Sequence, residues 1–257
     1  MNISEAKIEV VRPDIFKEGE GIAAWFTLRN ANLFSDNRNI AGLNLGLNTS
    51  ESEEVVRNNR TALFENLQLS PDWVAFGNQV HGNRIQVISR GGTYTETDGF
   101  VTRVPRLALA IQVADCAAVL LGDSRHRVIA AVHAGWKGAA GGIVPRAIKY
   151  MTAQGARPGH IKAFVSPCIS KRRFEVGHEV ARQFPEAFVD YESYEKPHVD
   201  LKGFIRHQLI EKGVKPEHIE IHSGCTVSSD SYYSYRRQDE QSGRMAGIIQ
   251  LLKRYEY

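Results

Sequence analysis

The sequence predicts an α+β fold in which layers of helices cover mixed sheets within a single domain. Its short apolar runs are continuous rather than alternating, which is typical of strands covered on both faces. Segments with helical spacing and capping residues lie between these runs. A unit of helix, proline-containing turn, strand and polar residue also recurs, at 155–168 and 213–225 and more loosely at 67–81. Such a fold brings side chains from several strand ends to common edges.

The strands are expected wherever an apolar run of suitable length occurs. The first is a buried strand at 22–28, and a polar, Asn-rich loop follows at 30–48. Further strands are expected at 73–76, 85–88, 107–113, 117–121, 128–132, 162–165 and 220–222.

Three helices are expected from their end signals. Ser50 and Glu53 form a capping box for a helix that ends near Leu67. The other two helices are expected at 143–153, with Pro145 in the first turn and Gly155 after the end, and at 201–212, with Asp200 as the cap and Gly213 after the end.

Composition places the chain among ordinary globular proteins and assigns residues 1–257 to one domain. A chain of 257 residues with 42% hydrophobic residues buries enough surface to fold without a disulfide or a metal. The net charge of +3 is no polybasic footprint and argues against nucleic acid as a partner. No apolar run is long enough to span a membrane, and residues 1–11 lack the apolar core of a signal peptide. Three cysteines indicate a reducing compartment, and we expect the cytoplasm.

Soft or borderline metal ligands stand where predicted strands end. Cys116 and His133 each follow a strand, and His81 lies between two short ones. Zinc prefers Cys and His, and three protein ligands leave a fourth position for water, as in catalytic sites. From the residues alone, a buried structural cysteine with two hydrogen-bonded histidines is the alternative. Cys168 and Cys225 also end strands, and we interpret them as buried thiols near the site rather than as ligands.

Two further segments suit an anionic ligand. The Gly-rich run 135–142 precedes a helix, and its amide groups are candidates for holding phosphate, with close backbone packing as the alternative. Arg236 and Arg237 stand beside aromatic residues and suit a planar or anionic ligand, with a solvated hairpin edge as the alternative. Most of the remaining histidines are expected at the surface: His126, His160, His178, His198, His207, His218 and His222.

These motifs, in this order, resemble the bacterial multicopper-oxidase-like or "laccase domain" family, whose members are described as purine nucleoside phosphorylases with adenosine deaminase activity, and some as peptidoglycan-editing factors. The resemblance extends over about residues 42–252 and includes Asn44–Leu45–Gly46 and Asn58–Asn59–Arg60 in the first block. The motifs that carry it are Gln79–Val80–His81–Gly82, Thr97–Asp98–Gly99–Phe100–Val101–Thr102, Ala114–Asp115–Cys116, His133–Ala134–Gly135–Trp136–Lys137–Gly138 and Gly243–Arg244. Ala118 replaces the Pro that the family usually has two residues after the cysteine.

The resemblance implies a layered α/β/β/α fold and a zinc site formed by His81, Cys116 and His133. It also implies phosphorolysis of adenosine, inosine, guanosine and methylthioadenosine, and deamination of adenosine. A water activated by zinc would attack C6 of adenine, with Asp115 as the proton relay or, alternatively, as an anchor for a ligand. The candidates for binding substrate and phosphate are Asn44, Arg60, Lys137, Arg236 and Arg237.

Three other functions use the same residues. Multicopper oxidase chemistry is rejected because the nine histidines form no His-x-His pair, although copper remains possible at the Cys–His site. The main alternative is a metal-independent cysteine hydrolase that edits muropeptide precursors in peptidoglycan synthesis. In it Cys116 is the nucleophile and His133 or His81 is the base. The third is a zinc-stabilised domain that binds a protein partner.

Overall fold

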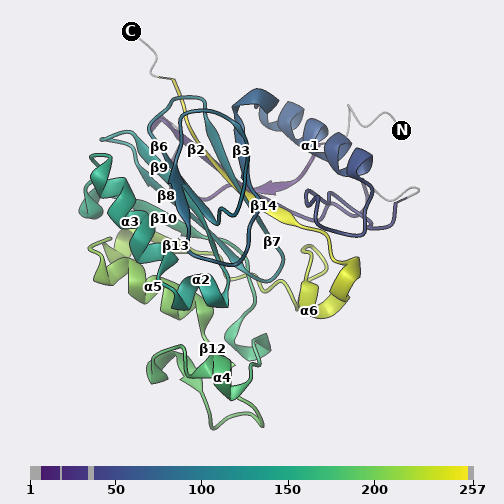
Figure 1. Cartoon of the computed structure of the whole chain (residues 1–257), viewed down its shortest axis with the longest axis vertical. Helices are drawn as coiled ribbons and strands as arrows, with labels where there is room; N and C mark the ends of the chain where they lie inside the picture. The colour runs from purple at the N-terminus through teal and green to yellow at the C-terminus, as the bar shows by residue number, and fades with distance from the viewer. Residues whose placement is uncertain (1–6, 18, 34–37, 254–257) are drawn as a thin grey trace.

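Two mixed sheets form the centre of the computed structural model, which describes residues 7–17, 19–33 and 38–253 (Figure 1). The first sheet has the spatial order β1 (Val10–Val11), β2 (Ile22–Thr27), β14 (Met245–Leu251), β7 (Ala108–Val113), β3 (Val74–Gly77) and β5 (Gly92–Tyr94). The second has the order β13 (Ile219–Ile221), β10 (Lys162–Val165), β8 (Ala117–Asp123), β9 (Val128–Ala134), β6 (Gly99–Thr102) and β4 (Ile85–Val87). Both sheets contain parallel and antiparallel pairs.

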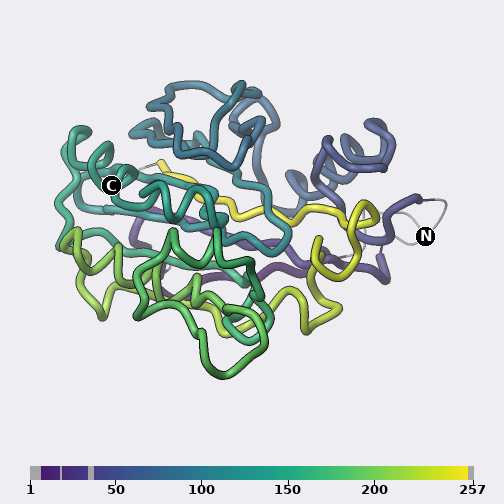
Figure 2. Tube along the Cα trace, turned by 60° about the horizontal axis from the view of Figure 1, so that its bottom comes forward, coloured from purple at the N-terminus to yellow at the C-terminus, as the bar shows by residue number. Residues whose placement is uncertain are grey.

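Helices cover the outer face of each sheet. The long helix α1 (Glu53–Leu67) lies on one side of the sheets, and α2 (Trp136–Ala140), α3 (Ile143–Ala153) and α5 (Leu201–Glu211) lie on the other (Figure 1). The short helix α4 (His178–Ala181) belongs to a segment with a two-stranded sheet, β11 (Val189–Asp190) and β12 (His198–Val199). This segment projects from the layered body in both views (Figure 2). The last helix is α6 (Tyr235–Gln238).

Three apolar clusters separate four layers. One packs α1 against the first sheet, with Leu63 and Phe76 among its members. A second lies between the two sheets and includes Phe26 and Leu120. The third packs the second sheet against α3 and α5, with Ile148 and Leu209. This arrangement is the expected α/β/β/α fold with mixed sheets.

Strands β8 and β9 show why the apolar runs are continuous. In β8, Val119 and Leu121 face the helices, whereas Ala118 and Leu120 face the other sheet. Neighbouring residues of a strand point to opposite faces, so a strand in the middle of four layers buries every side chain. The prediction of doubly covered strands is confirmed.

The recurring sequence unit corresponds to one local structure. A 3-10 helix that begins at proline precedes a strand three times: η2 (Pro71–Trp73) before β3, η3 (Pro158–His160) before β10 and η6 (Pro216–His218) before β13. Two of these strands, β10 and β13, are parallel neighbours, with Ala163 opposite Ile219.

The helix predictions are confirmed with two adjustments. The helix at 143–153 matches α3, and Asp200 caps α5 by accepting from the backbone N–H of Gly203, although α5 ends at Glu211. The capping box with Ser50 is wrong because α1 begins at Glu53, so that Ser52 caps it by accepting from the N–H of Val55. The hydroxyl of Ser50 instead donates to the Glu240 carbonyl.

Most expected strands are present within one or two residues. The strand expected at 73–76 starts at Val74 because Trp73 belongs to η2, and β8 and β9 extend to Asp123 and Ala134. The described part of the expected loop at 30–48 contains neither helix nor strand. Residues 34–37 of that loop, and residues 1–6 of the segment judged not to be a signal peptide, lie outside the described residues. No helix in the described ranges is long and apolar enough to cross a membrane.

Candidate metal centre and adjoining pocket

The antiparallel pairing of β8 with β9 brings Cys116 next to His133. Ala118 is the register partner of His133, so Cys116, two residues earlier, comes opposite Gly135. His133 shares its strand face with Ile129 and Ala131, which face the other sheet. The imidazole therefore points into the layer between the sheets, at its edge.

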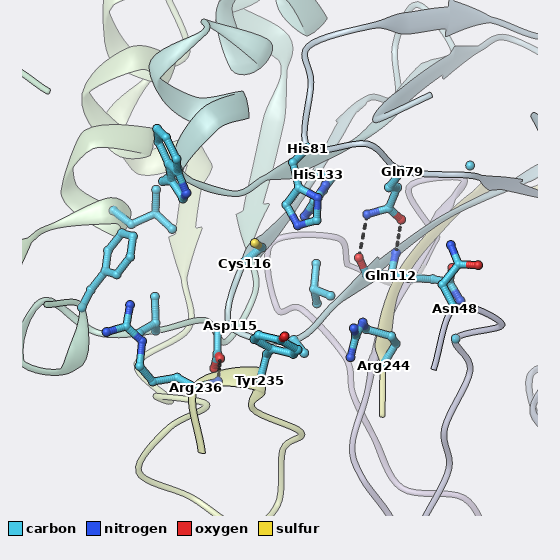
Figure 3. Close-up of a pocket in the computed structure, with 18 residues that line it drawn as sticks. Asn48, Gln79, His81, Gln112, Asp115, Cys116, His133, Tyr235, Arg236 and Arg244 are labelled. Carbon is cyan, nitrogen blue, oxygen red and sulfur yellow. Dashed lines mark hydrogen bonds between the residues drawn. The ribbon is translucent and has the colours of Figure 1, made fainter. Parts of the chain in front are cut away.

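His81 completes the group from the loop after β3. The ligand atoms of His81, Cys116 and His133 all lie within 4.8 Å of one another. The two imidazole rings meet edge to face, with their centroids 4.8 Å apart, and Figure 3 shows them beside each other above the Cys116 sulfur. The structure thus brings together the three residues that the sequence singled out as metal ligands.

Gly135 keeps the space around the three ligands open. A Cβ at this position would lie 2.7 Å from Cys116 Sγ and 3.6 Å from His133 Nε2. The sulfur and Nε2 therefore face the same small cradle, which any larger residue would fill. One thiolate and two imidazoles form a donor set that zinc prefers, so the residues present fit a zinc ion.

Asp98 holds both histidines in place. Its fully buried carboxylate accepts hydrogen bonds from Nδ1 of His133 at 2.8 Å and from the backbone N–H groups of Val80, His81 and Gly82. Burial raises the pKa of Asp98, but these hydrogen bonds and the charge of His133 bring it below its usual value. The bond to Nδ1 leaves Nε2 of His133 to act as the ligand, the usual arrangement at metal sites.

A second contact fixes the loop that carries His81. The Gln79 side chain donates to the backbone carbonyl of Gln112 and accepts from its N–H, at 2.7 and 2.8 Å (Figure 3). Gln79 thus pairs with β7 as a strand residue would, just beyond the end of β3. His81 itself has a left-handed backbone, with φ of 59°, which the bonds to Asp98 stabilise.

Cys116 and His133 form a pair of a negatively charged thiolate and a positively charged imidazolium. Burial raises the pKa of the Cys116 thiol, but the charge of His133 and hydrogen bonds from His133 and His81 outweigh burial and bring the pKa to about 6. Burial lowers the pKa of His133, but the Cys116 thiolate and Asp98 raise it to about 9. Cys116 is therefore a thiolate near neutral pH, which is the form that binds metals, whereas His133 is protonated and has to release its proton when a metal binds.

These ligands form one wall of a pocket of about 490 Å³. Trp136, Phe174 and Leu201 give part of the lining an apolar and aromatic surface. Two cationic side chains, Arg236 and Arg244, lie on either side of Tyr235 (Figure 3). The pocket therefore combines flat apolar surface with two guanidinium groups near the metal ligands.

The other predicted site residues divide into two groups. Asp115 and Arg236 line the pocket, and the Asp115 carboxylate accepts from the Thr226 hydroxyl and from the Arg236 N–H, at 2.6 and 2.7 Å. The remaining candidates do not line it: Asn44, Arg60, Lys137 and Arg237.

Each of these four side chains lies outside the pocket lining. Asn44 is buried and accepts from the N–H groups of Gly46 and Arg244. Arg60 donates to the Leu45 carbonyl, and burial together with Arg57 lowers its pKa to about 10. Arg237 donates to the carbonyls of residues 227, 229 and 232, and Lys137 is exposed beside Trp136.

Three local expectations are corrected. The segment at Arg236 and Arg237 is the helix α6 rather than a hairpin edge, with its N-cap Ser234 accepting from the Arg237 N–H. His198 is buried, with its Nδ1 bonded to the Lys171 carbonyl, rather than at the surface. Cys168 is buried as expected, whereas Cys225 is half-buried, and all three cysteines are free thiols.

Sequence reasoning assigned no role to several residues of this site. Asp98 and Gln79 stand in quoted motifs, but their tasks depend on strands that are distant in sequence. Arg244 also stands in a motif, and its guanidinium is anchored through Nη1 to the carbonyls of Ser242 and Gly243. For Asp98 and Arg244, a charged residue next to a glycine inside a motif is the signal that the sequence offers.

The family model for the multi-copper polyphenol oxidoreductase laccase matches residues 23–252. The chain belongs to this family. A Deinococcus radiodurans protein named purine nucleoside phosphorylase is 40% identical over 218 residues, which cover 83% of this chain and 84% of that protein. A Mycobacterium tuberculosis protein, purine nucleoside phosphorylase Rv2149c, is 37% identical over 211 residues, which cover 80% and 83%.

A solved structure of the same family agrees with the fold. The hypothetical protein YfiH from Bacillus licheniformis has a TM-score of 0.86 and 27% identity, with 97% of this chain and 98% of that chain covered. The family's name refers to copper, whereas the group beside the pocket of this laccase-family chain is a single Cys and two His.

Proposed function

We propose that this laccase-family protein is a zinc-dependent purine nucleoside phosphorylase that also deaminates adenosine. The observation that carries the proposal is the convergence of His81, Cys116 and His133 on the wall of a pocket with aromatic and guanidinium groups. The names of its relatives support the phosphorylase part of this proposal.

The three ligand residues would hold the zinc ion. When bound, zinc supplies a Lewis acid and lowers the pKa of bound water, which suits hydrolytic deamination. A thiolate with two imidazoles favours zinc, and we propose it rather than a copper cluster. Asp98 and Gln79 position the ligands through the contacts described above.

Phosphorolysis depends on this chain's cationic residues. In this reaction a phosphate oxygen bonds to the anomeric carbon of the ribose as the bond to the purine breaks, and the purine leaves with a proton. Arg236 and Arg244 are our candidates for holding phosphate, since each is anchored through Nη1 to backbone carbonyls and a guanidinium has five donors. The flat surfaces of Phe174 and Trp136 suit the purine.

We propose that Asp115 is an anchor rather than the proton relay. One oxygen accepts from the Thr226 hydroxyl and the other from the Arg236 N–H, so both are engaged. In this role Asp115 orients α6, which carries Arg236. Arg60, Lys137, Asn44 and Arg237 then support the structure around the pocket rather than bind substrate. The substrates are small molecules, and we propose the cytoplasm as the location because all three thiols are free.

One set of assays tests the proposal. Purified protein is analysed for zinc and copper, and adenosine and inosine are supplied with and without phosphate. We expect about one zinc bound at the His81–Cys116–His133 group, adenine formation from adenosine that requires phosphate, and inosine formation that does not. Cys116→Ser abolishes both products, whereas the control Cys225→Ser retains them.

A different result would favour the cysteine hydrolase. The same three residues place a thiolate beside two imidazoles, as in nucleophilic catalysis. If metal-free wild type cleaves the amide bond of a muropeptide, and Cys116→Ser abolishes that cleavage, the zinc-dependent proposal is wrong. Oxidation of a phenol by copper-loaded protein alone would overturn it in favour of copper chemistry.

A further inference from the structure

A second group of metal-ligating side chains lies at the opposite end of β8 from Cys116. Asp123 is the last residue of that strand, His126 lies in the turn to β9, and His160 is the last residue of η3. The pairing of Gly122 with Lys162 in β10 brings the end of η3 to this edge. At the rise of a strand, Asp123 lies about 23 Å from Cys116. We call Asp123, His126 and His160 the distal group.

The distal group is compact. One ligand atom from each residue lies within 4.8 Å of the others. The imidazoles of His126 and His160 are stacked, with centroids 5.3 Å apart and ring planes 11° apart. The fully buried Asp123 carboxylate lies 2.7 Å from Nδ1 of His126. It also accepts from the backbone N–H groups of His126 and Arg157, which fix its orientation.

One nitrogen of the distal group lacks a partner. Nδ1 of His160 is buried and makes no hydrogen bond within the described ranges. A buried polar atom without a partner costs free energy, and a bound cation would remove that cost. His218 has the corresponding position at the end of η6 and the same lone Nδ1. It belongs to no group of three ligands among the described residues, so it is a natural control.

We propose that the distal group binds a divalent zinc ion at a site separate from the pocket. Two imidazoles and one carboxylate suit zinc, whereas calcium and magnesium prefer oxygen ligands throughout. The positive charges of Arg125 and Arg157 act on His160 and oppose a cation. The distal site therefore binds zinc more weakly than the Cys-containing site. Its ion ties the turn after β8 to η3 and stabilises this end of the sheet.

Zinc binding is measured in a parent that lacks the first site. This parent carries Cys116→Ala and His81→Asn, since Asn tolerates the left-handed backbone at position 81. Equilibrium dialysis is expected to give two zinc ions per chain for wild type and one for the parent. Adding His160→Asn removes that ion, whereas adding His218→Asn leaves it. Zinc raises the Tm of the parent and of the His218→Asn variant but not of the His160→Asn variant.

The proposal is overturned if the parent binds no zinc, or if His160→Asn binds as much as the parent. Circular dichroism in chelator checks that each variant folds. If His160→Asn does not fold, a footprint on the parent replaces it: zinc protects His126 and His160 from diethyl pyrocarbonate, but leaves the exposed His207 reactive. Equal modification of all three histidines with and without zinc overturns the proposal as well.

Discussion

The buried carboxylate of Asp98 accepts a hydrogen bond from His133 Nδ1 at 2.8 Å, which turns Nε2 toward Cys116. The same carboxylate binds the backbone of the loop that carries His81. Asp98, which directly precedes β6, thereby orients His81 and His133 from two other parts of the chain. The geometry of this candidate metal centre therefore depends on a residue that does not itself belong to the His81–Cys116–His133 group.

Asp98→Asn is expected to weaken zinc binding at the His81–Cys116–His133 group by about 10–100-fold. Asn has the same shape as Asp. Its NH₂ group is a donor, however, and would face N–H donors in place of a carboxylate oxygen that accepts their hydrogen bonds. Competition with a chromophoric chelator measures the affinity. The exposed Asp72→Asn serves as the control and keeps the wild-type value. Unchanged affinity in a folded Asp98→Asn protein would contradict the positioning role.

Gly135→Ala is expected to disturb the same centre from the other side. The added Cβ meets Cys116 Sγ at 2.7 Å, so the sulfur or the loop has to move. Overpacking of about 1–3 kcal/mol corresponds to a loss of about fivefold to about 150-fold in metal affinity. The thiolate-to-cobalt absorption band of the cobalt-substituted protein reports the change.

Gly159→Ala is the matched control for Gly135→Ala. Its added Cβ meets only the end of Lys215, at 3.8 Å, which is an ordinary contact. The cobalt–thiolate band should therefore stay at its wild-type intensity. A Gly135→Ala protein with an equally intense band would show that the cradle beside Cys116 is not needed.

Arg60→Met is expected to lower stability rather than substrate binding. The guanidinium donates to the Leu45 carbonyl and lies over the Phe76 ring, 4.1 Å from its centroid. Removing these contacts costs about 1–3 kcal/mol of unfolding free energy, measured in urea. The exposed Arg57→Met loses only an ion pair with Glu53 and should change stability by less than about 0.5 kcal/mol. A large rise in KM for phosphate with unchanged stability would show instead that Arg60 binds phosphate.

The rate of alkylation of Cys225 is expected to depend on pH with a midpoint near 7. Burial raises the pKa of this thiol, but hydrogen bonds from Ser170 and Ser228 bring it to about 7. Burial raises the pKa of Cys168 to about 12, which keeps that thiol protonated. The thiolate reacts, so labelling of Cys225 by iodoacetamide rises as pH increases through 7 while Cys168 stays unlabelled.

Mass spectrometry of the Cys116→Ser protein separates the two remaining thiols. The double variant Cys116→Ser/Cys225→Ser should show no rapid labelling. A labelling profile for Cys225 with a midpoint at the ordinary thiol pKa would show that the serine contacts do not stabilise its thiolate.

Several features of the fold follow directly from local sequence. Continuous apolar runs indicated strands covered on both faces, because a strand with one solvated face has polar residues at alternate positions. Asp200 could be identified as a helix cap because capping uses neighbours three residues away. Local sequence does not distinguish Ser50 from Ser52 as the cap of α1, because only the position of the first helical turn decides between two serines two residues apart.

The prediction of His81, Cys116 and His133 as metal ligands came from the sequence, through residue types that zinc prefers and motifs that resemble one family, and the structure brings these three side chains together. Which cations reach the pocket was decided by tertiary structure. Arg236 and Arg237 are adjacent in sequence, yet only Arg236 lines the pocket, because consecutive residues of a helix project about 100° apart. The role of Asp98 likewise arises from β6 lying beside β9, which brings Asp98 to His133, 35 positions further along the chain. Local patterns specify elements and chemical types, whereas long-range register specifies which side chains meet.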